Sequence, residues 1–181
     1  MKTVYIERSA GSGRGGDWTE SLDLDGVQRL VVGTGPGSFA GIRSALAFAQ
    51  GYALGRPCEV LGLPSACAVA AQVFAAAGTV PLAVVGDSRR GMAWVAIFDG
   101  FEQKGAVFQV AQAELKGTVP ADCRVVTPDA ERIGDLLREA FGARYLGGEV
   151  PTAEGLRRFA EACPAALKPE PLPIYLNPAV R

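Results

Sequence analysis

The chain has 181 residues, 49% of them hydrophobic, which is enough for one compact domain or two small ones with a sizeable core. Its formal net charge of −1 gives no strong field for nucleic acid or a membrane surface, so we expect any contact with RNA to run through a partner. The sequence contains no histidine, which excludes Ser-His-Asp and Cys-His nucleophiles and removes the commonest zinc ligand.

The first half of the chain predicts strands and helices separated by glycine-rich turns. The apolar run at 27–32 ends at glycine and is the firmest strand of this half. We expect, in chain order, a strand at 2–6, a flexible loop at 11–16, a strand at 18–24, a strand at 27–32, a helix that ends near Gly55, a strand at 58–63, and a helix that Ser65 caps and that reaches about Ala77.

The second half opens with three successive strands at 81–86, 92–98 and 106–110, joined by short polar turns, which predicts an antiparallel meander. A short strand, a helix at 128–140, another short strand and a last helix capped by Thr152 follow, and the tail is proline-rich and extended. This order indicates a mixed α/β layered fold and fits two ribonuclease-H-like halves. We expect subdomains at 1–78 and 79–181 that meet near residues 75–80 and near the last helix.

The glycine-rich stretch between the strand at 27–32 and the next helix reads GTGPGSFAGIR from Gly33 to Arg43. A strand, a glycine turn and a helix N-terminus form the geometry that can hold phosphate. The stretch lacks the GK[ST] of a Walker A loop, and Ser38 stands where a dinucleotide-binding fingerprint needs its last glycine. A tight turn with Ser38 as N-cap explains the pattern equally well.

The helix after this turn has two apolar faces on a 100° wheel. We expect Phe39, Ile42, Leu46 and Ala49 to pack on a sheet of the same chain. The second face is either covered by the same chain or open to a partner helix, and it consists of Gly41, Ala45, Phe48 and Tyr52.

The stretch GTGPGSFAGIRSALAFAQGYALG resembles the GxGPGSFTGxR signature of the bacterial TsaB (YeaZ) family. Three further segments are similar to that family: LGLPSACAVA, the DSRRG turn at 87–91 and the tail PLPIYLNPAVR. The motif residues of the turn are Gly35, Pro36, Gly37, Ser38, Phe39, Gly41 and Arg43.

The resemblance implies an actin/Hsp70/sugar-kinase-like fold of two ribonuclease-H-like subdomains. It implies a non-catalytic subunit that binds the catalytic protein TsaD, together with the ATPase TsaE, in forming threonylcarbamoyladenosine at position 37 of ANN-decoding tRNAs. It implies no catalytic residue, metal or cofactor in this chain, contact with tRNA only through the complex, and a possible homodimer when the chain is alone. The partner surface expected from the helix is Gly41, Ala45, Phe48 and Tyr52.

The chain departs from the family pattern at three places. Only about twenty residues separate the first strand from RLVVGTG, too few for the hairpin and long helix that the family has there, so we expect a shortened N-terminal subdomain. Ala40 replaces threonine in GSFTG, and Glu7-Arg8-Ser9 replaces Asp-Thr-Ser.

Two other function classes stay open on the sequence. A nucleotide-dependent phosphotransferase or ATPase of the same fold would need a carboxylate for Mg²⁺, for which Glu7 and Asp87 are the candidates. We expect Glu7 to form a surface ion pair with Arg8, and Asp87 to be a turn residue. A degenerate peptidase-like domain lacks any visible nucleophile–base pair.

The cysteines and the N-terminal segment indicate the cellular compartment in which we expect the protein. The four cysteines form no CxxC pair and lie among apolar or small residues, so we expect buried free thiols: Cys58, Cys67, Cys123 and Cys163. The start MKTVYIERSAG has no apolar core of signal-peptide length, and no apolar run is long enough to span a bilayer. We therefore expect a cytoplasmic protein.

Overall fold

A computed structural model describes residues 1–10 and 18–176 and places their strands in two sheets. The first sheet has the order β1-β2-β3-β9, in which β1, β2 and β3 are parallel and β9 is antiparallel to β3. Its strands are β1 (Lys2–Ile6), β2 (Val27–Gly33), β3 (Glu59–Leu63) and β9 (Lys168–Pro169).

The second sheet has the order β6-β5-β4-β7-β8. Strands β4, β5 and β6 form the predicted antiparallel meander, and β7 and β8 add to it in parallel. Each meander strand is longer than predicted. The strands are β4 (Leu82–Arg89), β5 (Met92–Asp99), β6 (Glu102–Ala111), β7 (Arg124–Thr127) and β8 (Tyr145–Gly148).

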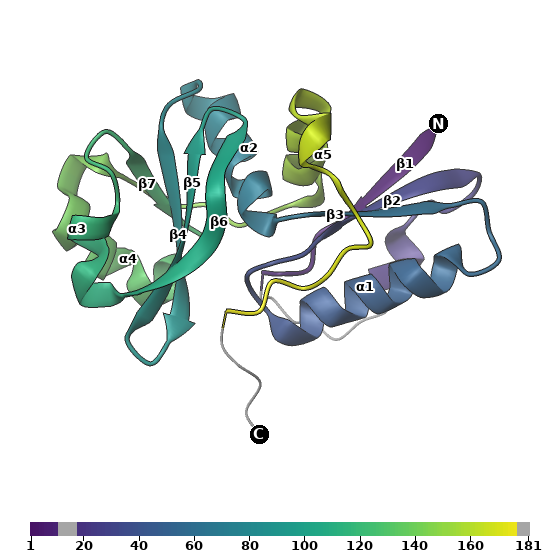
Figure 1. The fold of residues 1–181 in the computed structure, drawn as a ribbon, viewed down its shortest axis with the longest axis horizontal. Coiled ribbons are helices and arrows are strands. Elements are labelled where there is room, and N and C mark those ends of the chain that lie inside the picture. The colour runs from purple at the N-terminus through teal and green to yellow at the C-terminus, as the bar shows by residue number, and fades with distance from the viewer. Residues whose placement is uncertain (11–17, 177–181) are drawn as a thin grey trace.

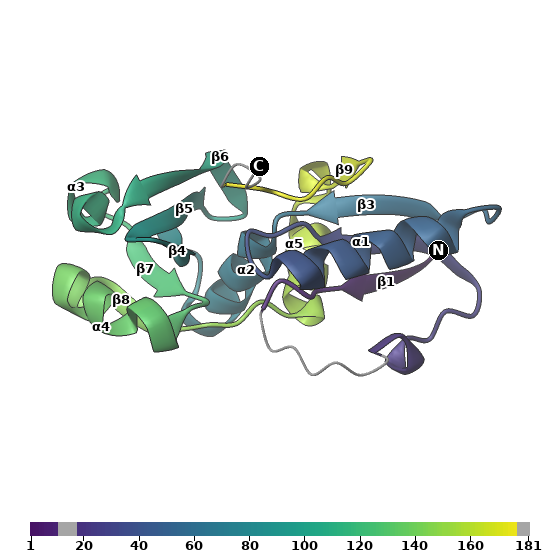
Figure 2. The same cartoon turned by 90° about the horizontal axis from the view of Figure 1, so that it is seen from below.

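Helices form layers on both sides of each sheet (Figures 1 and 2). Helix α1 covers one face of the first sheet, α2 and α5 lie between the two sheets, and α3 and α4 cover the outer face of the second sheet. The helices are α1 (Phe39–Ala53), α2 (Ser65–Ala77), α3 (Leu115–Thr118), α4 (Ala130–Phe141) and α5 (Ala153–Ala162). Short 3-10 turns occur at Trp18–Ser21, Gln112–Glu114, Gly142–Arg144 and Pro164–Ala166.

The central core joins the two halves. Alternate residues of β4 face opposite sides: Leu82 and Val84 pack toward α2, whereas Ala83 and Val85 pack toward α4. Both faces of β4 are therefore buried, as expected for a strand covered by helices on both sides.

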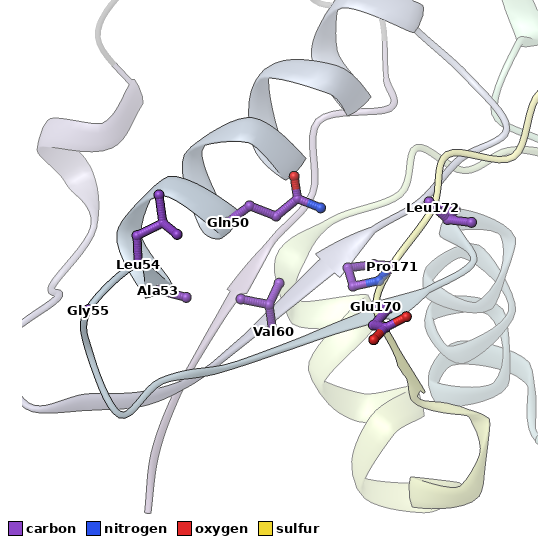
Figure 3. A pocket seen from close by; sticks show the side chains of 8 residues that line it. All are labelled: Gln50, Ala53, Leu54, Gly55, Val60, Glu170, Pro171 and Leu172. Carbon is purple, nitrogen blue, oxygen red and sulfur yellow. The ribbon is translucent and has the colours of Figure 1, made fainter.

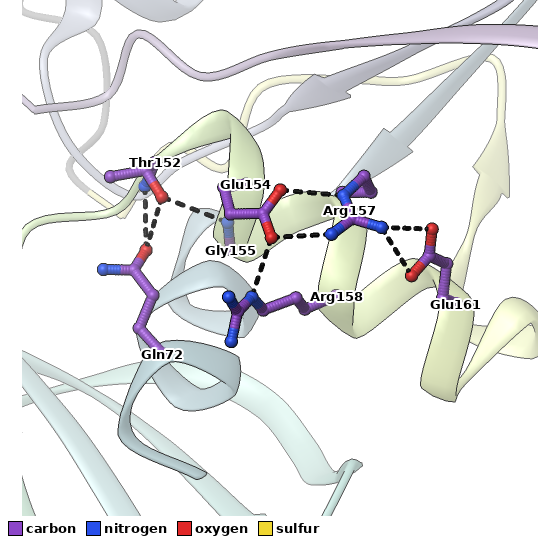
Figure 4. A network of polar contacts seen from close by, with 7 residues as sticks. All are labelled: Gln72, Thr152, Glu154, Gly155, Arg157, Arg158 and Glu161. Carbon is purple, nitrogen blue, oxygen red and sulfur yellow. Dashed lines mark hydrogen bonds and ion pairs between the residues drawn. The ribbon is translucent and has the colours of Figure 1, made fainter. Parts of the chain in front are cut away.

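Helix α5 is fixed to α2 by a polar network around its N-terminus (Figure 4). The Oε1 atom of Gln72 in α2 accepts from the backbone N–H of Thr152 at 3.0 Å and from its hydroxyl at 2.9 Å. The same hydroxyl accepts from the N–H of Gly155 at 3.0 Å, which confirms Thr152 as the cap of the last helix. Beyond the cap, Arg157 and Arg158 both pair with Glu154 on the exposed side of α5.

Three local expectations need comment, and two of them are wrong. Residues 18–21 form a 3-10 turn and no strand follows before β2. Ser65 is the first helical residue of α2 rather than its cap, and its hydroxyl accepts a hydrogen bond from the distant Gly35 N–H instead. The loop expected at 11–16 lies outside the described residues.

Two expectations about the chain as a whole can be compared with the structure. The four cysteines are free, with Cys67 and Cys123 buried and Cys58 and Cys163 only half-buried. No helix within residues 1–10 and 18–176 is both long and apolar enough to cross a membrane.

Candidate functional site

The glycine turn between β2 and α1 is held by the backbone of three neighbouring segments. Gly35 donates its N–H to the Ser65 hydroxyl at 3.0 Å, and Ser65 returns its own N–H to the Gly35 carbonyl at 2.8 Å. The Ser38 N–H donates to the Ser9 carbonyl at 2.7 Å. Gly35 has a φ of +90°, a region that favours glycine. The turn therefore joins the carboxyl ends of β1, β2 and β3 at one edge of the first sheet.

Helix α1 begins where Ser38 ends the turn. The Ser38 hydroxyl accepts from the N–H of Gly41 at 3.3 Å, so the predicted N-cap is confirmed. Gly41 is needed by the chain itself, because a Cβ there would overlap the carbonyl oxygen of Arg8. Its small size therefore lets the segment after β1 pack on the helix, and does not by itself indicate a partner.

The side of α1 that packs on the sheet differs from the predicted side at two positions. Ile42, Leu46 and Ala49 are buried as expected. Ala45 is 0% exposed, so the expectation that it stays open to a partner is wrong. Phe39 is 58% exposed, so its predicted burial is also wrong.

The two corrections have separate causes. The flank with Ala45 is covered by the segment before β2, where Leu22 and Leu24 pack on the same core and the Tyr52 hydroxyl donates to the Leu24 carbonyl at 2.8 Å. Phe39 lies in the first turn of α1, at the edge of the sheet, and packs on Tyr175 with ring centroids 5.5 Å apart.

Phe48 and Tyr52, the aromatic residues of the expected partner surface, are half-buried. Their rings lie 6.3 Å apart and pack beside the core under α1. They border the solvent-facing side of the helix without forming its centre.

The open side of α1 carries small residues that the hydrophobic pattern of the sequence does not single out. We call this the outer face of α1, and its exposed residues are Ala40, Arg43, Ser44, Ala47, Gln50 and Gly51. Four of them are small and follow one another by three or four positions, which places them along one line of the helix: Ala40, Ser44, Ala47 and Gly51. A helical wheel also places these four residues on one line, but their side chains are too small to mark a large apolar face.

A second feature of the site is a cleft of about 1360 Å³ between the two sheets. The glycine turn, the end of β4 and the start of α4 line it. Asp87 is one of four acidic residues that line the cleft, with Asp129, Glu131 and Glu149. It belongs to β4, so the expectation of a turn residue is wrong. The Asp87 carboxylate is only 8% exposed and pairs with the Arg132 guanidinium at 3.1 Å, while Arg132 also pairs with Asp129.

Glu7, the other candidate carboxylate, is turned into the protein. Its Oε1 atom accepts from the Ser9 N–H at 2.7 Å, and its Oε2 atom is buried with no hydrogen-bond partner among the described residues. Burial raises the pKa of the Glu7 carboxyl above its usual range. The expected surface ion pair with Arg8 is therefore wrong, and neither acidic side chain presents a free carboxylate to the cleft.

Comparison with known proteins gives a family match and a curated relative. Residues 19–117 match the family model described as TsaD: tRNA N6-adenosine threonylcarbamoyltransferase. The chain is 32% identical over 73 residues to the tRNA threonylcarbamoyladenosine biosynthesis protein TsaB of Escherichia coli (strain K12). That match covers 40% of this chain and spans 32%, about a third, of the relative's length.

Two solved structures from Pseudomonas aeruginosa share the fold. YeaZ has a TM-score of 0.68 and 22% identity, over 87% of this chain and 79% of the other. A protein described as uncharacterized, with similarity to peptidase YeaZ, has a TM-score of 0.67 and 20% identity, over 88% and 78% of the two chains. The chain thus shares the two-sheet architecture of these structures, which is consistent with the actin/ribonuclease-H-like fold that the resemblance implies.

Proposed function

We propose that the chain takes part in forming threonylcarbamoyladenosine on tRNA. The chain belongs to the family whose model is described as TsaD, and within it to the TsaB (YeaZ) proteins. In this proposal it is a non-catalytic partner subunit that binds TsaD and works with TsaE, and it reaches tRNA only through them. The lack of histidine and the near-neutral charge support this division of roles.

The outer face of α1 is the observation that carries the proposal. Small side chains allow a second helix to approach closely, and the half-buried Phe48 and Tyr52 provide aromatic contacts at the border. The partner surface is therefore moved by one flank of the helix, from Gly41 and Ala45 to the line through Ala40, Ser44 and Ala47.

The alternative of a nucleotide-dependent phosphotransferase has less support. Such an enzyme needs a carboxylate that can hold Mg²⁺ and water. The Asp87 carboxylate is bound by Arg132, and Glu7 is buried against the backbone of its own loop.

Replacing single alanines by glutamate tests the partner surface. Ala47→Glu adds bulk and a charge on the outer face, and we expect it to fold normally but to lose affinity for TsaD of the same organism by about 2–5 kcal/mol. Isothermal titration calorimetry with purified TsaD measures the affinity, and thermal unfolding measures the fold.

Two further variants make the result specific. Ala162→Glu changes an exposed alanine at the end of α5, on the other face of the first sheet, and should bind TsaD like the wild type. Ala45→Glu places a carboxylate in the core and should unfold the protein. If Ala47→Glu folds and binds TsaD with full affinity, the partner surface lies elsewhere.

A further inference from the structure

The chain after β9 runs past the β3 edge of the first sheet (Figures 1 and 2). It passes β3, where Pro171 packs so closely that a Cβ on Gly62 would lie 2.6 Å from the Pro171 Cβ. The Ile174 N–H then donates to the Thr34 carbonyl at 2.9 Å, and Tyr175 packs on Phe39. Residues 174–176 form part of the cleft wall. We call residues 171–176 the C-terminal strap.

We propose that the C-terminal strap is a movable closure of the cleft, latched by the Phe39 ring. Closed, the strap covers one side of the cleft with Ile174, Tyr175 and Leu176. Released, it leaves the glycine turn, Trp94 and the end of β4 open to solvent from that side.

The strap is held by few contacts, which is what a movable segment needs. Within the described part of the chain, residues 172–176 are connected to the rest by one backbone hydrogen bond, one aromatic pair and the packing of the half-buried Leu176 side chain against the central core. Leu172 is 77% exposed and Tyr175 is 53% exposed. Near its start the strap leaves an apolar hollow of about 410 Å³ beside the end of α1, lined by Leu54, Val60 and Leu172 among others (Figure 3).

The contact between Phe39 and Tyr175, which we call the latch, lies next to the proposed partner surface. This part of the inference rests on the proposed function. The Phe39 ring contacts Tyr175 on the strap, and the Arg43 guanidinium lies 4.9 Å from the centre of the same ring. Arg43 belongs to the outer face of α1. A partner that docks there holds Arg43 and Phe39 in place, so docking should stabilise the closed strap.

Hydrogen exchange at the Ile174 amide, followed by NMR, measures the latch directly. Aromatic pairs contribute enough that Phe39→Ala or Tyr175→Ala should speed exchange by about two- to ten-fold. Phe108→Ala removes another partly exposed aromatic ring, on β6, and should leave the rate unchanged. If the Ile174 amide exchanges at the same rate in the Phe39→Ala variant and in the wild type, Phe39 does not hold the strap and the proposal is wrong.

Tryptophan fluorescence tests whether the strap closes the cleft. A Trp18→Phe background leaves Trp94, a residue of the cleft wall, as the only tryptophan. Acrylamide should quench Trp94 more strongly after Tyr175→Ala than before it. If quenching does not change although Ile174 exchange has accelerated, the strap moves without closing the cleft, and that half of the inference is wrong.

Purified TsaD completes the test with the wild-type chain. Binding should slow exchange at Ile174, and Phe39→Ala should remove that slowing. If TsaD binds without changing the exchange rate, the link between strap and partner is refuted. If TsaD does not bind at all, the proposed function fails, while the two measurements on the isolated protein still decide whether the strap is a latched closure.

Discussion

Gly41 lies in the family motif, and its lack of a side chain is required by the packing of the chain itself. The carbonyl oxygen of Arg8 occupies the space that a Cβ would need. Gly51 lies ten residues later in the same helix, and nothing lies within 4 Å of the position that its Cβ would take. Packing therefore requires glycine at position 41, whereas position 51 has room for a larger side chain.

Substituting alanine at each glycine separates these roles. Gly41→Ala should lower the free energy of unfolding by about 1–3 kcal/mol, because the helix or the segment after β1 must shift. Gly51→Ala should raise it by about 0.5–1 kcal/mol, because alanine loses less backbone entropy in a helix. Urea denaturation of both variants measures the changes. Similar stability of Gly41→Ala and the wild type would contradict the packing described here.

Hydroxyl caps show which residue roles the sequence could predict. Ser38 and Thr152 accept from an N–H three residues ahead, so a local pattern was sufficient to find them. The hydroxyl of Ser65 bonds to Gly35, thirty residues earlier. No spacing rule along the chain could indicate that contact, because it depends on β2 and β3 being neighbours.

At the scale of elements, helix α1 was predictable as a helix but not in its orientation. The wheel located Ile42, Leu46 and Ala49 in the core. It could not show that Leu22 and Leu24 cover the adjacent flank, because the pattern of their segment indicated a strand. The candidate partner surface was therefore placed one flank away from the side that is open.

The hydrogen bonds of Gln72, which connect α2 to the N-terminus of α5, give a second prediction about the elements. Gln72 connects α2 to Thr152 and to the Val150 carbonyl, which accepts from its Nε2 at 3.0 Å. Gln72→Ala should lower the free energy of unfolding by about 1–2 kcal/mol, since these polar groups lose their partners. In a chain of this size the melting temperature should fall by about 2–8 °C.

Gln50→Ala is the matched control, because Gln50 is an exposed glutamine in the last turn of α1. It should change stability by less than about 0.5 kcal/mol. Calorimetry on both variants gives the comparison. Equal melting temperatures would mean that the network in Figure 4 does not hold α5 to α2.

The whole molecule consists of two sheets around a shared layer of helices. Element order was sufficient to predict the mixed α/β fold and the antiparallel meander of the second sheet. It could not predict that β9 would return to pair with β3, because two residues are too few to give a strand signal. The boundary near residue 78 between two subdomains stays a prediction, and the return of β9 shows that the end of the chain rejoins the first sheet.

The first sheet is the smaller of the two. It contains three parallel strands and the two residues of β9 among the described residues, whereas the second sheet has five strands. The expected partner surface lies on this smaller half, on the side of α1 that faces away from the sheet. The proposed binding of TsaD therefore rests on the smaller of the two sheets and on helix α1, which covers it.

Reconstitution of the modification tests the central proposal most directly. Purified TsaD and TsaE of the same organism are incubated with ANN-decoding tRNA and the threonylcarbamoyl donor, with and without this chain, and threonylcarbamoyladenosine is measured by mass spectrometry of the digested tRNA. We expect modified nucleoside only when the chain is present, and none from the chain alone. Equal product with and without the chain, or product from the chain in the absence of TsaD, would contradict its role as a non-catalytic partner.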